Sequence, residues 1–251
     1  MYHTTGFTRD QITDLCVLVR QAAHDEGTRF WPPILGLFTS VAVVLTHLRR
    51  NRVQDELAEA FGVSQPTISR AVTRLTSVLG TVLADHVPTA EDLDETTQHV
   101  VDGTLLPCWS WASHRELYSG KHKKTGMNIQ VACTTSGQLA WISDPVEGSR
   151  HDTHCLHQSG VLATHDPANW IGDKGYIGNG MLTPIRKPAH RELLDWEKEF
   201  NQQINRIRSI IERIIADLKT WRILHTDYRR PFATFAQTIS TVIALRFYQL
   251  R

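Results

Sequence analysis

The spacing of apolar residues changes near residue 90, and this change constrains the fold more than any other feature. Before it, apolar residues recur at helical spacing, as in Ile12, Leu15 and Val19. After it, they gather in short β-rich runs at residues 99–101, 129–135, 139–143, 170–171 and 182–185. Between the two regions, the segment 85–95 holds five acids and no lysine or arginine, which is typical of a solvated linker. We therefore expect a helical domain at residues 1–88 and an α/β domain at residues 89–251.

The predicted helices follow from periodicity and end signals. Thr8 and Gln11 have the spacing of a capping box, which predicts a helix from about residue 8 to residue 24. A largely buried helix is predicted at residues 34–50, and two shorter helices follow, separated by residues 62–64. In the second domain, a long helix is predicted at about residues 193–218, with a last helix after Pro231.

Composition excludes several classes of protein. The chain has 251 residues, with 27 basic and 26 acidic side chains, so any preference for a charged partner depends on where the charges lie. The four cysteines include no CxxC pair, which argues against a disulfide framework and a thiolate zinc cluster. The most apolar stretch, residues 34–48, is too short and too polar in places to span a bilayer. We expect a soluble intracellular protein with no membrane partner.

Residues 57–75, LAEAFGVSQPTISRAVTRL, have the layout of a helix-turn-helix, at about 54–79 in full. Gly62 opens the turn, Ser64 is placed as N-cap, and Pro66 lies in the first turn of the second helix. The second helix is expected to expose side chains suited to base edges and phosphates, namely Gln65, Thr67, Ser69, Arg70, Thr73 and Arg74. The alternative is an ordinary helical hairpin with a polar outer face. Taken alone, this segment would suggest a repressor.

Three acids in the second domain suggest a metal site. Asp102 follows the run at 99–101, Asp173 follows the run at 170–171, and Glu212 lies within the long predicted helix, beside an isoleucine stripe that can pack on the sheet. Three carboxylates that converge from two strands and a helix could hold two Mg²⁺ or Mn²⁺ ions for chemistry at phosphorus. Each acid also has a simpler interpretation: the aspartates could cap turns, and Glu212 could pair with Arg208 at i, i+4.

Five segments together resemble a known family. They are VVDGT at 100–104, SGKHKKTGMNIQV at 119–131, GSRHD at 148–152, GDKGY at 172–176 and RSIIERIIADLK at 208–219. The chain resembles the RNase H-like DDE transposases of bacterial insertion sequences, in the branch allied to Harbinger elements. The Tyr-x2-Arg-x3-Glu-x6-Lys signature of related transposases appears here as Arg208, Glu212 and Lys219, with Asn205 in place of the tyrosine.

The resemblance implies a fold and an activity. It implies an RNase H-like mixed sheet flanked by helices, preceded by an all-α helix-turn-helix domain. Asp102, Asp173 and Glu212 would hold two Mg²⁺ (or Mn²⁺) ions, hydrolyse the phosphodiester at the transposon ends and join the 3′-hydroxyl to target DNA. Two DNA ends need two active sites, so a homodimer on double-stranded DNA in the bacterial cytoplasm, associated with the nucleoid, is expected. The alternatives are a domesticated or inactive copy that only binds DNA, and a helix-turn-helix transcriptional regulator.

Further residues are expected near this site. Lys121, Lys123 and Lys124 lie in a basic loop near Trp109, Trp111 and Tyr118, which is either a phosphate track or a solvated turn. Lys219 is a candidate phosphate contact, Arg208 a candidate partner of Glu212, and Asp152 a candidate auxiliary acid. The histidines and cysteine at 151–157 lack a second distant ligand pair, so we do not expect zinc.

Overall fold

The computed structural model describes residues 1–109 and 113–251, and its contacts divide them into two compact units. One unit contains Met1–Val87 together with Lys219–Arg251, and the other contains Pro88–Leu218. The first break lies close to the boundary expected at residue 88. The C-terminal segment was expected in the α/β domain, but its contacts place it in the helical unit.

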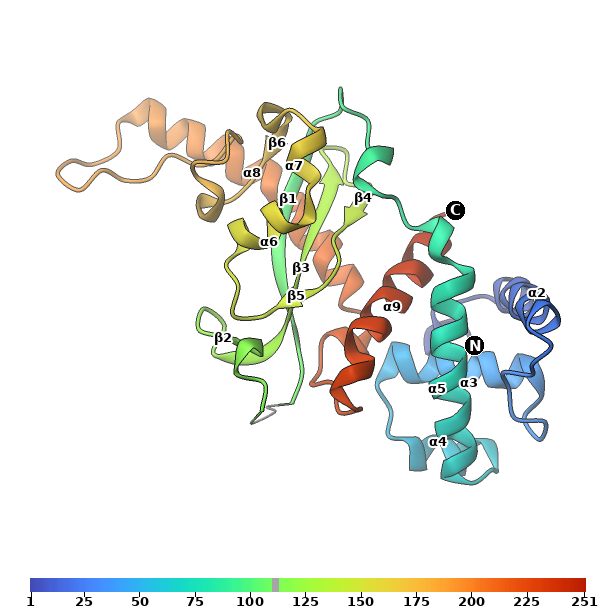
Figure 1. Ribbon diagram of the computed structural model, residues 1–251. Helices are drawn as coiled ribbons and strands as arrows, with labels where there is room; N and C mark the ends of the chain where they lie inside the picture. Colours follow the sequence, from blue (N-terminus) through green and yellow to red (C-terminus); the bar gives the residue numbers. More distant parts are fainter. Residues whose placement is uncertain (110–112) are drawn as a thin grey trace. The chain divides into compact units, whose positions relative to one another are not determined.

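The helical unit consists of helices joined by short turns (Figure 1). Its α-helices are α1 (Tyr2–Thr5), α2 (Arg9–Asp25), α3 (Gly36–Arg50), α4 (Gln54–Phe61), α5 (Gln65–Val82) and α9 (Phe235–Gln249), and its 3-10 turns are η1 (Ala84–His86), η6 (Arg222–Leu224) and η7 (Phe232–Thr234). The predicted capping box is confirmed: the Gln11 amide donates to Thr8 Oγ1 at 3.2 Å, and the Thr8 amide donates to Gln11 Oε1 at 3.0 Å.

The last helix packs against the second helix of the helix-turn-helix. Buried residues occupy most of α9, so no single polar stripe marks a solvent side. The Thr241 hydroxyl donates to the Thr76 carbonyl at 2.9 Å, which ties α9 to α5. A helix that is apolar on most sides must pack against several neighbours to bury its side chains, and α9 does this within the helical unit.

His47 is buried in this unit. Its side chain is 4% exposed, its Nδ1 lies 3.0 Å from the Arg52 carbonyl, and its Nε2 has no hydrogen-bond partner among the described residues. Burial lowers the pKa of His47 to about 4; the hydrogen bond to Arg52 opposes this shift, and the charges of Arg230 and Arg229 add to it. The folded protein therefore binds fewer protons at His47 than the unfolded chain between about pH 4 and pH 6.5.

We expect this histidine to make the helical unit sensitive to acid. Because the folded pKa is below the unfolded pKa, stability is present above about pH 6.5 and is lost as the pH falls toward 4. The expected loss from His47 is about 2 kcal/mol at pH 5. His47→Asn keeps an amide donor but cannot be protonated, so urea unfolding should show a smaller loss between pH 7.5 and pH 5. His24→Asn, at an exposed histidine, should lose as much as the unchanged chain; equal losses in both variants would refute the prediction.

The α/β unit is built on a mixed sheet. Its strands are β1 (His99–Pro107), β2 (Tyr118–Ser119), β3 (Lys124–Thr134), β4 (Leu139–Ile142), β5 (Val146–Glu147) and β6 (Trp170–Ile171). The order is β2-β3-β1-β6, with β4 and β5 also paired to β3. β1 pairs antiparallel with β3 and parallel with β6. Four of the five predicted runs contain strands; 182–185 does not, because only Leu182 bridges to Ile171 and the backbone of Ile185 pairs with the Asn201 side chain.

Helices cover both faces of this sheet (Figure 1). The helices are α6 (Asp152–Ser159), α7 (Val161–Thr164) and α8 (Asp195–Leu218), with 3-10 turns η2 (Ala90–Asp92), η3 (Arg115–Leu117), η4 (Pro167–Asn169) and η5 (Lys174–Tyr176). On one face, Val101 packs in a core cluster with Leu156 of α6 and Val161 of α7. The next residue, Asp102, points to the other face because side chains alternate along a strand, and there it meets Arg208 of α8. The unit thus has the mixed α/β architecture that the sequence implies.

Candidate functional site

Strand pairing brings Asp102 and Asp173 together. In the parallel pair of β1 and β6, Val100 lies opposite Ile171. Each aspartate is two residues beyond its member of this pair, so Asp102 within β1 and Asp173 just beyond the end of β6 lie on neighbouring strands. Asp173 also caps η5, because its Oδ1 accepts a hydrogen bond from the Gly175 amide at 2.7 Å. The capping role and a site role are therefore compatible.

Asp102 lies in a partly buried, charged environment. Its side chain is 22% exposed, it accepts a hydrogen bond from the Gly103 amide at 2.9 Å, and Nη2 of Arg208 lies 3.5 Å from its Oδ2. Burial raises the pKa of Asp102 to about 6, against the lowering effect of Arg208, and the charges of Asp173 and Asp152 raise it further. An added cation at this place would favour the ionised carboxylate.

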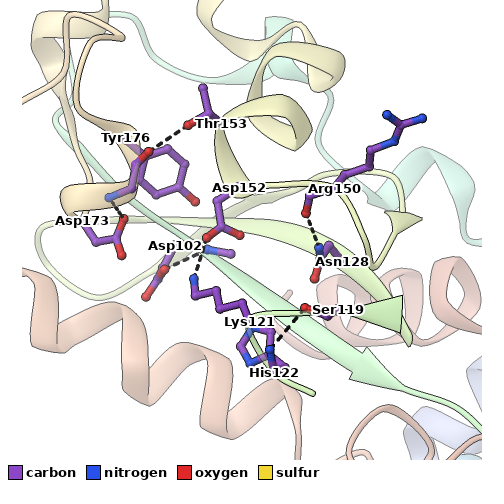
Figure 2. Close-up of polar contacts among 12 residues, drawn as sticks. Asp102, Ser119, Lys121, His122, Asn128, Arg150, Asp152, Thr153, Asp173 and Tyr176 are labelled. Carbon is purple, nitrogen blue, oxygen red and sulfur yellow. Dashed lines mark hydrogen bonds and ion pairs between the residues drawn. The ribbon is translucent and has the colours of Figure 1, made fainter. Parts of the chain in front are cut away.

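Asp152 and Lys121 complete the charged group (Figure 2). Asp152 is the first residue of α6, and its side chain is 15% exposed. Lys121 Nζ donates to Asp152 Oδ2 at 2.7 Å. Burial lowers the pKa of Lys121, but the hydrogen bond and charge of Asp152, with the charges of Asp173 and Asp102, raise it above its ordinary value overall. The four side chains therefore act on one another electrostatically.

A polar cleft of about 300 Å³ opens beside this group. Its walls are the turn at 119–122, which leads into β3, and the loop at 148–152, which leads into α6. Both segments belong to sequence motifs singled out above. The Asn128 side chain fixes the second wall by donating to the Arg150 carbonyl at 2.9 Å. The cleft has room for a small polar group next to Asp152 and Lys121.

Glu212 is placed differently from the aspartates. It lies on α8 one turn beyond Arg208, and its side chain is exposed. The ion pair that the structure shows for Arg208 is with Asp102 and not with Glu212. Lys219, the third residue of the helical motif, directly follows α8. Within residues 1–109 and 113–251, no three His, Cys, Asp or Glu side chains are close enough to hold a metal ion in this conformation, and this includes the cluster at 151–157.

The sequence analysis did not single out two buried polar residues near the acids, Tyr176 and Gln130. Tyr176 is fully buried, and its hydroxyl donates to Gln130 Oε1 at 2.5 Å. Gln130 lies on β3 and is also fully buried, and its Nε2 has no partner among the described residues. The available signal was a glutamine within the largely apolar run at 129–133, because a buried amide normally requires partners.

The helix-turn-helix has the predicted layout. Gly62 ends α4 with a φ of 64°, a left-handed conformation that favours glycine, and Ser64 is the N-cap of α5. Arg70, Thr73 and Arg74 are exposed, while Gln65 and Ser69 are partly exposed. Thr67 was expected on the exposed face, but it is only 6% exposed. Its hydroxyl is hydrogen bonded to Ser64 Oγ at 3.0 Å, so it closes the first turn of the helix.

One of the three lysines in the basic loop, Lys121, is engaged in an ion pair. Lys123 and Lys124 are exposed, as are Trp109 and Tyr118, while Lys121 is engaged by Asp152. Trp111 lies outside the described residues. In the described part of the chain, no helix is long and apolar enough to cross a membrane.

Comparison with known proteins finds two matching families and two relatives. The family described as "DDE superfamily endonuclease" matches residues 101–246, and the one described as "Helix-turn-helix of DDE superfamily endonuclease" matches residues 35–85. A putative transposase for insertion sequence element IS112 from Streptomyces albus G is 29% identical over 222 residues, covering 88% of this chain and 83% of the relative. A probable transposase for insertion sequence element IS702 from Microchaete diplosiphon is 25% identical over 228 residues, covering 87% and 82%. No solved structure matches the chain.

Proposed function

The chain belongs to the DDE superfamily endonucleases, and from this premise we propose that it is an insertion-sequence transposase that cuts and joins DNA at the ends of its element. The helix-turn-helix would bind the terminal inverted repeats, and the α/β unit would carry the chemistry. The observation that supports this most is the parallel register of β1 and β6, which puts Asp102 and Asp173 on neighbouring strands.

The donor atoms of these side chains are of the kind that a hard divalent cation binds. They offer carboxylate oxygens, which Mg²⁺ and Mn²⁺ prefer, and a lysine ammonium already lies among them as a cation. We propose Asp102, Asp173 and Glu212 as ligands of two such ions. When bound, the ions supply Lewis acidity that activates a nucleophile and neutralises charge at phosphorus. Arg208 would orient Asp102, with which it forms an ion pair.

Two reactions at phosphorus would follow one another. Water would attack the phosphodiester at the element end, breaking the bond to the 3′-oxygen and leaving a 3′-hydroxyl. That hydroxyl would then attack a phosphodiester of the target, so that one bond forms as another breaks. The carboxylates would bind the metal ions at neutral pH, and they need not attack phosphorus themselves. Because an element has two ends, we propose that two copies of the chain act together on DNA.

The DNA would be held at two places. Arg70 and Arg74 would contact the repeats from α5, with Gln65 and Ser69 near base edges. Lys123 and Lys124 are exposed next to the polar cleft and would contact phosphates of the strand being cut. Lys219 would contact a phosphate from the end of α8.

A nicking assay tests the proposal. The substrate is duplex DNA that carries the inverted repeats flanking the gene, and the control has the repeats scrambled. We expect cleavage at the repeat ends with Mg²⁺ or Mn²⁺ and none with EDTA. Binding of the repeats without metal-dependent cleavage would favour a domesticated copy or a helix-turn-helix regulator instead.

A further inference from the structure

Resting on the proposed cleavage function, we infer that Tyr176 is a positioning residue, which fixes the turn that carries Asp173 through a hydrogen bond to Gln130. Tyr176 is fully buried, so it acts through Asp173 and does not touch the DNA. Three features of the α/β unit support the inference. They are the burial of Tyr176 within an exposed turn, the firm hold on Gln130 within the sheet, and the unpaired amide that the hydrogen bond leaves behind.

The turn that carries Asp173 is anchored by Tyr176. Of the described residues at 173–180, Tyr176 alone is buried. The hydrogen bond from the Gly175 amide to Asp173 lies within the turn, so it does not tie the turn to the rest of the unit. One tie comes from α6, where Thr153 Oγ1 donates to the Gly175 carbonyl at 2.8 Å, beside Tyr176 in Figure 2. The other tie is the side chain of Tyr176.

The Tyr176 ring packs with the residues that precede both aspartates. A Cβ at Gly172 would lie 2.8 Å from Cδ2 of the ring, closer than real Cβ atoms approach another atom, so the ring lies directly on the backbone before Asp173. The ring also belongs to the core cluster that contains Val101, the residue before Asp102. A shift of the ring would therefore move Asp173 with respect to β1.

Gln130 gives the Tyr176 hydroxyl a fixed partner. It lies on β3 directly opposite Gly103, the residue after Asp102. Its backbone is held by Ser143: the Gln130 amide donates to Ser143 Oγ at 2.9 Å, and the Ser143 amide donates to the Gln130 carbonyl at 2.9 Å. The Tyr176 hydroxyl donates to Gln130 Oε1 at 2.5 Å. This hydrogen bond therefore joins the turn of Asp173 to the strand that pairs with the strand of Asp102.

Stability alone does not explain this polar pair. Gln130 is fully buried, and its Nε2 has no partner among the described residues. A buried donor without a partner is costly, and two apolar side chains of similar shape would avoid that cost. Natural proteins keep such costly features mainly at functional sites. Burial raises the pKa of Tyr176 well above its ordinary value, and the charges of Asp152 and Asp102 add to this, so the hydroxyl stays a donor at neutral pH.

The test compares Tyr176→Phe with Tyr228→Phe in single-turnover cleavage of repeat-bearing DNA at saturating DNA. Tyr228 is another fully buried tyrosine, in the helical unit, and its hydroxyl is hydrogen bonded to Thr234 and Thr238. Tyr176→Phe should cleave at least about tenfold more slowly with unchanged DNA affinity, because small displacements of a catalytic group are costly. Tyr228→Phe should cleave at the rate of the unchanged chain. Equal rates for the two variants would refute the positioning role.

A double variant separates positioning from stability. Tyr176→Phe combined with Gln130→Leu removes both polar partners and leaves no buried group unpaired. Urea unfolding should show that it is at least as stable as Tyr176→Phe alone. Its cleavage should nevertheless stay slow, because the turn of Asp173 is no longer tied to β3. Cleavage that recovers together with stability would show that the pair supports only the fold, contrary to the inference.

Hydrogen exchange tests the same link without DNA or metal. In the full chain, the backbone amides of residues 172–178 should exchange about tenfold faster in Tyr176→Phe than in Tyr228→Phe, because the turn opens more readily without its hydrogen bond. Equal exchange in the two variants would overturn the inference. If the unchanged chain does not cleave repeat DNA, the proposed function fails, and exchange still decides whether Tyr176 holds the turn.

Discussion

Asp173→Asn is expected to reduce cleavage at the element ends at least about a thousandfold, equivalent to about 4 kcal/mol in the activation barrier. The physical reason is the loss of one of the two negative charges that lie on the neighbouring strands β1 and β6. Asparagine keeps an oxygen that can accept the hydrogen bond from the Gly175 amide, so the turn at η5 should remain intact. The loss should therefore come from metal binding and not from the fold.

The measurement is single-turnover cleavage of a repeat-bearing duplex in Mg²⁺, with DNA affinity measured separately. Asp173→Asn should bind the repeats as tightly as the unchanged chain, because α5 is untouched. Asp144→Asn serves as the matched control, since it makes the same chemical change at an exposed position. If Asp173→Asn cleaves at the rate of this control, Asp173 is only a turn cap and the catalytic assignment fails.

The double change Arg70→Ala and Arg74→Ala is expected to weaken binding to the terminal repeats at least about thirtyfold. Each arginine that contacts a base edge or a phosphate contributes about 1–3 kcal/mol, and both side chains are exposed on α5. Neither change removes buried packing, so stability should change by less than about 1 kcal/mol.

Fluorescence anisotropy with labelled repeat DNA measures this loss at fixed salt, because phosphate contacts depend strongly on ionic strength. Arg20→Ala is the matched control: it removes an exposed arginine from α2, outside the helix-turn-helix. Binding by the double variant as tight as by this control would show that α5 does not contact the DNA. Together with Asp173→Asn, the result separates recognition from cleavage.

The sequence predicted local structure well where the cause is local. The capping box at Thr8 and the turn at Gly62 depend on residues within a few positions of one another, and the structure confirms both. The sequence was a poorer guide where contact with a residue distant in the chain determines the local structure. The run at 182–185 has strand-like composition, but the Asn201 side chain from α8 takes up the backbone groups of Ile185. A local contact also went unpredicted: helical spacing placed Thr67 on the exposed face, but its hydroxyl is hydrogen bonded to Ser64 three residues earlier.

The same contrast between local causes and contacts with distant residues applies to the candidate site. The sequence by itself determined which residues could serve the chemistry: acids directly after strand-like runs, a helix bearing Arg208 and Glu212, and a helix-turn-helix. Only the tertiary structure decided which of them meet. The parallel register of β1 and β6 joins Asp102 to Asp173, and the antiparallel register of β1 and β3 sets Gln130 opposite Gly103, where Asp152 rests. Chain neighbours fix helices and caps, whereas strand pairing between distant segments fixes distances between side chains, and periodicity along the sequence does not encode those distances.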